Sequence, residues 1–183
     1  MKKLLLFLFV ILGLNLSALA ENIHFNDLIY KLKTVDKNGT KLENDYYIDG
    51  ENDDFWTSKV EITYLPEVSN PLKYASEVDK KVSADEKKLL LKFVQNKKLD
   101  IAVLSYLENE FNDDCACFIY QVLKFEKHPD KGIMVLRFAK KYKVNTNDDI
   151  QKVANEIKSI NDDYMERIII SPIPPIVKEK ALP

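Results

Sequence analysis

Residues 101–142 read IAVLSYLENEFNDDCACFIYQVLKFEKHPDKGIMVLRFAKKY, and this stretch decides the fold. Three apolar runs lie within it, at Ile101–Leu107, Cys117–Phe125 and Ile133–Tyr142. The links between them are rich in Asn, Asp, Pro and Gly, which favour turns. Runs of this length between such turns are typical of β-strands. We therefore predict three consecutive antiparallel strands here.

Three more strands are predicted upstream of this stretch. Apolar side chains alternate with lysines over residues 28–33, and a second apolar run covers residues 42–48. Asn38-Gly39 stands between them, a dipeptide that favours a tight hairpin because both residues accept a positive φ. Residues 56–64 then place Trp, Val, Ile and Tyr on one face and Lys, Glu and Thr on the other, as a half-buried strand does.

The middle of the chain, residues 70–97, is predicted to form a pair of helices. Asn70 followed by Pro71 is a preferred helix start, with Asn as the N-cap and Pro at the first helical position. Ser83 and Glu86 have the spacing of a capping box, which starts a second helix. The apolar residues that follow give this second helix its buried stripe.

A long amphipathic helix is predicted near residues 147–169. Its apolar residues recur three or four positions apart, the period of one helical face: Ile150, Val153, Ile157, Ile160, Tyr164 and Ile168. The Pro-rich tail, residues 171–183, cannot continue the helix because proline lacks the backbone donor. Two interpretations of the tail stay open. It is either an extended strap along the domain, favoured by its Ile and Val residues, or a free PxxP peptide ligand.

These elements predict one α+β domain over residues 21–170. We expect an antiparallel sheet of five to six strands, with the central helical pair and the long C-terminal helix packed on it. The predicted organisation of the chain is a signal peptide at residues 1–20, this single domain, and the Pro-rich extended tail at residues 171–183.

The N-terminus has the parts of a secretory signal peptide. Two lysines follow Met1, an apolar run covers residues 4–12, and residues 18–20 read Ala-Leu-Ala, an A-x-A cleavage site. The apolar run is too short to span a bilayer comfortably, and no later segment is apolar enough to do so. We therefore expect cleavage after Ala20 and export to the periplasm or the outside. An uncleaved N-terminal anchor is the alternative.

The charge of the mature chain argues against a nucleic-acid partner. Removal of Lys2 and Lys3 from the 27 basic residues leaves 25 against 29 acidic residues, a net charge of −4. Binding by phosphate neutralisation needs a basic face. We expect a protein partner instead, and no cofactor.

Cys115 and Cys117 are the two cysteines of the chain. Residues two apart in a strand point to the same face with Cα atoms about 6.6 Å apart, at the upper edge of disulfide geometry. In an oxidising compartment a disulfide between them is expected. A pair of inert thiols and a redox or soft-metal site are the alternatives, and a metal would need ligands beyond these two.

Asn-Asp-Asp occurs four times, at residues 52–54, 112–114, 147–149 and 161–163. Clustered carboxylates suit calcium, but none of the four has the spacing of a calcium-binding loop. We interpret them as turn and helix-cap chemistry. The sequence lacks the zinc and phosphate-binding motifs and a G-x-S-x-G nucleophile. No catalytic, cofactor-binding or metal-binding residue is therefore predicted.

Two tyrosines are candidates for an interaction surface. Tyr47 and Tyr120 each lie opposite a neighbouring aromatic residue in the strand alternation, so one member of each pair is predicted to face outward. Exposed aromatic residues on a sheet suit a partner interface. Arg137 lies opposite the apolar face of its strand. It is interpreted as a solvated surface residue, with an anchoring ion pair as the alternative.

From the export signal, the full-sized fold and the missing motifs, we predict a non-catalytic exported protein that binds another macromolecule. Its partner would be an envelope component, a host surface or a toxin that it neutralises. A periplasmic thiol/disulfide or soft-metal-handling protein built on the Cys-x-Cys pair is the alternative. An unrecognised hydrolase is the third hypothesis.

Overall fold

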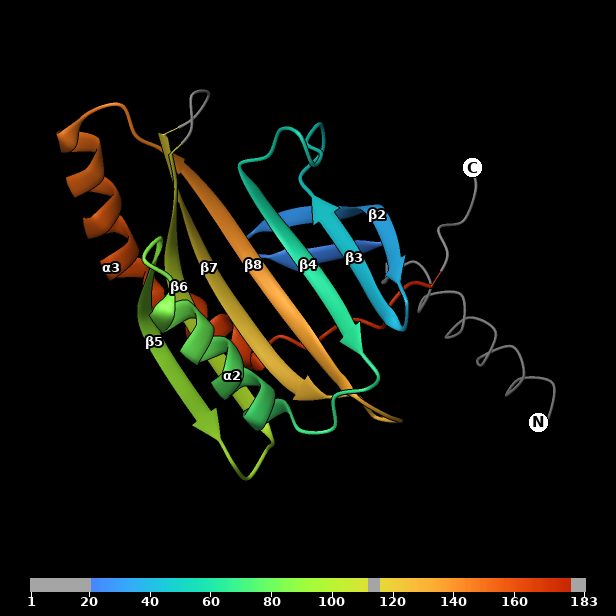
Figure 1. Ribbon diagram of the computed structural model, residues 1–183. Helices are drawn as coiled ribbons and strands as arrows, with labels where there is room; N and C mark the ends of the chain where they lie inside the picture. The colour runs from blue at the N-terminus through green and yellow to red at the C-terminus, as the bar shows by residue number, and fades with distance from the viewer. Residues whose placement is uncertain (1–20, 112–115, 179–183) are drawn as a thin grey trace, which may run out of the picture.

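The computed structural model describes residues 21–111 and 116–178. Within these residues the chain forms an eight-stranded antiparallel sheet and two helices (Figure 1). In chain order the elements are β1 (Asn22–Phe25), β2 (Leu28–Asn38), β3 (Lys41–Tyr47), β4 (Ser58–Leu65), α2 (Pro71–Ala84), β5 (Lys88–Asn96), β6 (Ile101–Phe111), β7 (Ala116–Lys127), β8 (Ile133–Lys143) and α3 (Asn147–Ile170). The strand order across the sheet is β1-β2-β3-β4-β8-β7-β6-β5. The first and second halves of the chain therefore meet where β4 pairs with β8.

The predicted α+β class, the antiparallel sheet and the C-terminal helix are confirmed, but the expected five to six strands are too few. The six predicted strands correspond to β2, β3, β4, β6, β7 and β8. Of the other two, β1 has four residues and pairs with β2. Such a short strand shows no clear period in the sequence. The other additional strand, β5, is the segment predicted as the second central helix.

The prediction of a central helical pair is therefore wrong for the second helix. α2 begins at Pro71 with Asn70 as N-cap, as predicted, and the Asn70 Oδ1 accepts the Lys73 amide at 2.9 Å. The chain then turns at Asp85, and residues 88–96 pair with β6 as a strand. The apolar spacing of this segment also fits a helix, but pairing with the free edge of β6 outweighs that local preference.

The two helices cover opposite faces of the sheet (Figure 1). α2 packs against β5, β6 and β7 over a core that includes Leu104 and Phe125. α3 packs against the other side of β6 and β7, over a core that includes Val103 and Tyr120. Val103 and Leu104 are neighbours in β6 and point to opposite sides, as successive strand residues do. We call the two sides the α2 face and the α3 face.

α3 matches the predicted long helix and starts with a capping box. The Thr146 Oγ1 accepts the Asp149 amide at 3.2 Å, while the Asp149 Oδ2 accepts the Thr146 amide at 3.0 Å. The Asn-Asp-Asp tripeptide at residues 147–149 therefore belongs to a helix cap, as interpreted from the sequence. No helix in the described part of the chain is both long enough and apolar enough to cross a membrane.

Residues 171–177 form an extended strap across the α3 face. At one end the Lys124 Nζ donates to the Ser171 carbonyl at 2.8 Å. At the other end the Asn44 side-chain amide donates to the Val177 carbonyl at 2.9 Å and accepts the Val177 amide at 2.7 Å. Strand pairing places Lys124 and Asn44 at the two ends of one row through β7, β8, β4 and β3. The tail thus follows the strap interpretation over its described residues.

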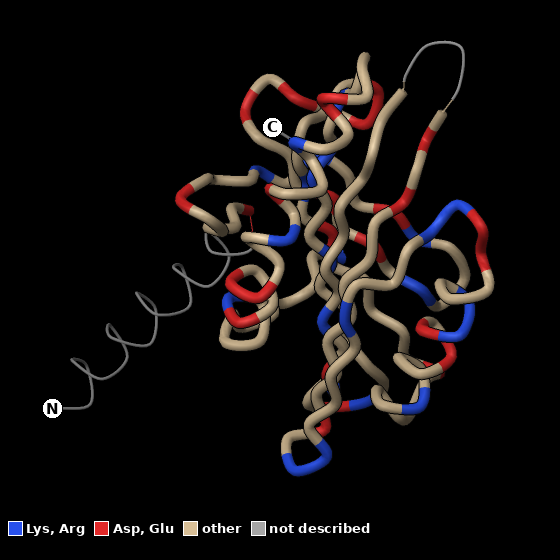
Figure 2. The backbone as a smooth tube through the Cα atoms, turned by 90° about the vertical axis from the view of Figure 1, so that its left-hand side faces the viewer, with Lys and Arg blue, Asp and Glu red and all other residues tan. Residues whose placement is uncertain are grey.

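Charged residues are distributed over the whole molecule. Figure 2 shows Lys and Arg positions interspersed with Asp and Glu positions along the described backbone. This mixture agrees with the small net charge of −2 that the full sequence carries.

Several predictions concern residues outside the described ranges. The signal peptide and its cleavage after Ala20 concern residues 1–20. Cys115 and the Asn-Asp-Asp tripeptide at residues 112–114 are also outside, as are residues 179–183 of the tail. These predictions stay untested by the structure.

Candidate functional site

One face of the sheet changes from apolar to charged across its strands. On the α2 face, paired residues form a row from β6 through β7, β8 and β4 to β3: Leu104, Leu123, Arg137, Glu61 and Asp45. The next row consists of Tyr106, Gln121, Ala139, Lys59 and Tyr47. α2 packs over the β5–β7 side of this face. In the described part of the chain, no helix covers the charged side formed by β8, β4 and β3.

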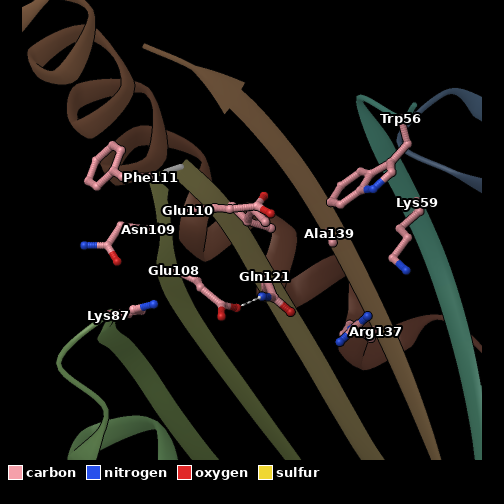
Figure 3. A pocket seen from close by; sticks show the side chains of 11 residues that line it. Trp56, Lys59, Lys87, Glu108, Asn109, Glu110, Phe111, Gln121, Arg137 and Ala139 are labelled. Atoms are coloured by element: carbon pink, nitrogen blue, oxygen red, sulfur yellow. Dashed lines mark hydrogen bonds between the residues drawn. The ribbon is translucent and has the colours of Figure 1, made fainter. Parts of the chain in front are cut away.

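A groove of about 570 Å³ opens on this face (Figure 3). Gln121 and Ala139 form its floor. Trp56 and Lys59 form the β4 side, and the side chains of Glu108 and Glu110 point into the groove from β6 on the opposite side. The short Ala139 side chain stands between the longer Gln121 and Lys59 side chains in its row. The groove is therefore hollow at its centre.

Hydrogen bonds fix the β6 side of the groove. The Gln121 Nε2 donates to the Glu108 Oε2 at 2.7 Å (Figure 3), and the Gln121 Oε1 accepts the Tyr106 hydroxyl at 2.9 Å. Burial raises the pKa of Tyr106 to about 12, so the hydroxyl keeps its proton for this bond at neutral pH. The Lys88 Nζ lies 3.6 Å from the Glu108 Oε1, which gives the carboxylate a cationic partner.

The other side of the groove carries a charged network, which we define as Asp45, Lys59, Glu61 and Arg137. The Lys59 Nζ is 3.7 Å from the Asp45 Oδ1 and 3.7 Å from the Glu61 Oε2. Arg137 forms an ion pair with Glu61, and its side chain is 29% exposed. The network is thus largely buried but reaches the groove through Arg137 and Lys59.

Trp56 stands between two lysines at the rim of the groove. The Lys59 Nζ is 5.6 Å from the centroid of the indole ring, and the Lys141 Nζ is 4.5 Å from it. The Lys141 Nζ is also 3.5 Å from the Glu110 Oε2 on the opposite side. Because cations are attracted to the face of an indole ring, these contacts hold Trp56 in position.

Glu43, Asp45 and Glu61 bring three carboxylates together, with oxygens within 4.8 Å of one another. Burial raises the pKa of Asp45 to about 6, and Lys59 opposes that rise. Lys59 and Arg137 pair with Asp45 and Glu61, and a lysine of β3 pairs with Glu43. Three cations therefore neutralise three carboxylates. The arrangement is an internal ion network and lacks the excess negative charge that a divalent cation requires.

The structure corrects the prediction that Tyr47 and Tyr120 form an outward-facing surface, because both side chains are 0% exposed. Tyr47 lies on the α2 face with Lys59 over its ring, and its hydroxyl is bonded to Asp53. Tyr120 lies in the core of the α3 face and donates to the Asn161 Oδ1 at 3.0 Å. Strand alternation predicts an outward position only where the outer face is solvated, whereas other side chains cover these two positions.

Of the predicted cysteine pair, the structure describes Cys117, which lies outside the groove. Cys117 is buried near the start of β7 and is not among the groove-lining residues, and Cys115 lies outside the described ranges. The disulfide between them therefore stays a prediction, as do the redox and soft-metal alternatives.

Sequence reasoning misses the groove. It interprets Arg137 as solvated, whereas the structure shows the alternative, an ion pair with Glu61. The signal in the sequence is the charge on one face of each strand, with Lys59 and Glu61 in one strand and Arg137 in another. Glu61 and Arg137 are 76 positions apart. Their contact therefore depends on the pairing of β4 with β8, which no local pattern reveals.

A protein-family model matches residues 17–173 of the chain. This range includes every residue of the groove and of the charged network. No curated protein and no solved structure matches the chain. The function of the groove must therefore be inferred from its own geometry.

Proposed function

The chain belongs to the family whose model matches residues 17–173, and on that premise we propose that it is an exported, non-catalytic protein that binds a partner protein through the groove. Export is the part of this proposal that rests on the sequence of residues 1–20. An envelope component, a host surface protein and a neutralised toxin are the partner classes that fit an exported binding protein.

An aromatic and an arginine side chain at the groove carry this proposal. Trp56 on the β4 side is half-buried, and the side chains of Glu108 and Glu110 stand on the opposite side. Aromatic and arginine side chains supply much of the binding energy of protein interfaces. Arg137 reaches the groove between these two sides. A partner segment in the groove would therefore bury residues of the types that dominate such interfaces.

Both signs of charge line the groove, which favours a polypeptide over a nucleic acid. Lys59, Lys87 and Arg137 contribute cations, and Glu108 and Glu110 contribute carboxylates. The phosphate backbone of a nucleic acid would be repelled by the two carboxylates. A protein surface that carries both signs of charge can complement both. The mixed charges in Figure 2 extend this pattern over the rest of the molecule.

The residue types of the groove favour binding over covalent chemistry. Its described lining side chains are Trp, Phe, Ile, Ala, Lys, Arg, Glu, Asn and Gln. Nucleophilic catalysis by a hydroxyl or thiol needs such a group beside a base that activates it, and neither Ser, Thr, Cys nor His is in this set. The charged groups are instead engaged with one another or with Trp56. They therefore form a rigid surface suited to recognition.

A photo-crosslinking amino acid tests the proposal in the native cells. We would place p-benzoylphenylalanine at Glu110, whose side chain points into the groove (Figure 3), and at Lys97, in the turn between β5 and β6. We expect a covalent adduct with one protein species from position 110 and none from position 97. The adduct should disappear when Trp56→Ala is added.

Three outcomes would contradict the proposal: equal adducts from both positions, no adduct at all, or an adduct that survives Trp56→Ala. Circular dichroism of each purified variant checks that the fold is retained. If Trp56→Ala does not fold, Lys87→Glu replaces it, because Lys87 is an exposed side chain at the groove.

A further inference from the structure

A second pocket, of about 440 Å³, lies on the α3 face beneath the strap. Val60 of β4, with Leu136 and Phe138 of β8, forms its floor. β1 and the end of α3 form its sides, and residues 171–175 form its roof. We call it the strap pocket. It is separate from the groove, because it lies on the opposite face of β4 and β8.

A ligand in the strap pocket would contact mostly carbon. The three floor residues are buried, and so is Ile168 on the α3 side. The hydroxyl of Ser171 is already bonded to the Arg167 carbonyl at 2.8 Å. Among the described residues, no Asp, Glu, Lys or Arg lines this pocket. Its walls therefore offer little to a polar or charged ligand.

The strap is suited to roof an apolar pocket. Pro172, Pro174 and Pro175 lack a backbone N–H group, so these positions leave no donor unsatisfied above the pocket. Hydrogen bonds from Lys124 at one end and with Asn44 at the other hold the strap across the sheet. The roof is thus anchored at both ends and apolar between them.

We propose that the strap pocket binds a single hydrocarbon chain, such as the acyl chain of a fatty acid or of a lipid. An apolar cavity of about 150 Å³ holds a molecule the size of benzene, and the strap pocket is nearly three times as large. Of the β1 residues that line it, Asn22 and His24 are polar and the more exposed. The polar end of an amphiphile would lie beside them.

The roofed shape favours a slender ligand over a protein segment. An α-helix with its side chains is about 10 Å in diameter and would have to displace the strap from Lys124 and Asn44. A hydrocarbon chain enters beneath the strap without breaking those hydrogen bonds. This proposal does not depend on the function proposed for the groove.

Titration with dodecanoate below its critical micelle concentration, followed by methyl NMR of the protein from its native cells, tests the inference. We expect saturable binding with shifts confined to methyl groups around the strap pocket, including those of Leu136, Ile168 and Ile173. A separate apolar hollow between β5 and α3 is lined by Leu89 and Ile157. Shifts centred on that hollow, or no saturable binding, would overturn the proposal.

Two matched variants locate the bound chain. Val60→Phe adds an aromatic ring to the floor of the strap pocket, and we expect the Kd for dodecanoate to rise about tenfold or more. Leu89→Phe places the same ring in the separate hollow and should leave the Kd unchanged. If circular dichroism shows that Val60→Phe does not fold, Ile173→Trp fills the pocket from the strap instead. A filled variant that binds dodecanoate as tightly as the wild type refutes the site.

A second arm of the experiment identifies the molecule that supplies the hydrocarbon chain. Vesicles of phosphatidylethanolamine and phosphatidylglycerol are added in place of dodecanoate. The same methyl shifts from vesicles support a chain taken from a phospholipid, and shifts from dodecanoate alone support a free fatty acid. The absence of strap-pocket shifts from both sources would overturn the proposal.

Discussion

Asn44→Ala removes the contact that holds the far end of the strap. Asn44 is 0% exposed on the α3 face, and its side-chain amide makes both hydrogen bonds to Val177. One such bond contributes about 0.5–1.5 kcal/mol net to stability. The released Val177 backbone can bond to water, so no desolvation penalty is added. We therefore expect the free energy of unfolding to fall by about 1–3 kcal/mol.

Thermal unfolding followed by circular dichroism measures this loss. For a chain of this length, 1 kcal/mol corresponds to about 2–4 °C in Tm, so the Tm should fall by about 2–12 °C. Asn155→Ala is the matched control, because Asn155 is exposed on α3. Alanine is the better helix former, so this control should leave the Tm unchanged or raise it slightly.

The same substitution in a chain that ends at Ile170 separates the strap contact from packing inside the sheet. The shortened chain lacks Val177 and should itself have a lower Tm than the full chain. Asn44→Ala should then cost about 1–3 kcal/mol less than it does in the full chain, because the two perturbations remove the same interaction. An equal cost in both chains would refute the reasoning, since Asn44 would then act independently of the strap.

Three further substitutions test the sheet and the charged network. Gly132→Ala should cost about 2 kcal/mol more in thermal stability than Gly50→Ala. The two glycines have φ of +84° and +86°, but an added Cβ would overlap the backbone of Leu65 and Pro66 at position 132 and meet no atom within 4 Å at position 50. Glu61→Gln leaves Arg137 without its carboxylate and should cost about 1–3 kcal/mol in urea unfolding. Burial raises the pKa of Asp45 from 3.8 to about 6, so the folded state binds this proton more tightly and stability falls as pH rises between about 4 and 6. Asp45→Asn should remove that fall. Urea unfolding at several pH values measures it: the free energy of unfolding should decline by at most about 3 kcal/mol in the wild type, and the variant should lack this decline.

Features encoded by neighbouring residues are the ones that the sequence predicts correctly. The predicted hairpin joins β2 to β3, but its turn is Gly39-Thr40, because Asn38 ends β2 and pairs with Lys41. Gly39 supplies the positive φ, of +62°, that such a turn needs. Asn70 caps α2 through its own side chain. The apolar stripe of residues 150–168 lies on one side of α3, whose buried residues face the core. In each case the chemistry acts within a few positions of the chain.

Residues 88–96 show where local pattern is ambiguous. Leu90, Phe93 and Val94 have spacings that suit one helical face, yet the segment pairs with β6 in the structure. A register shift between Leu90 and Lys92 disturbs the strict alternation that identifies a strand. The pairing with β6, which comes later in the chain, decides that this segment is a strand. The sequence of the segment alone does not contain that information.

The groove depends on strand order, which is a property of the whole fold. β4 and β8 are separated in the chain by α2, β5, β6 and β7. Tyr47 shows the consequence: its alternation predicts an outward position, but Lys59 of β4 lies over its ring and Asp53 accepts its hydroxyl. Alternation identifies which residues of a strand share a face. It does not identify what lies over that face.

The groove and the strap pocket depend on one shared strand register. Glu61 and Arg137 pair across β4 and β8 on the α2 face, while their neighbours Val60 and Leu136 line the strap pocket on the α3 face. A slip of one residue in β8 would turn Arg137 toward the apolar pocket and Leu136 toward the carboxylates. Such a slip would bury an unpaired charge among apolar side chains, which is strongly unfavourable. The ion pair on one face therefore also specifies the apolar site on the other.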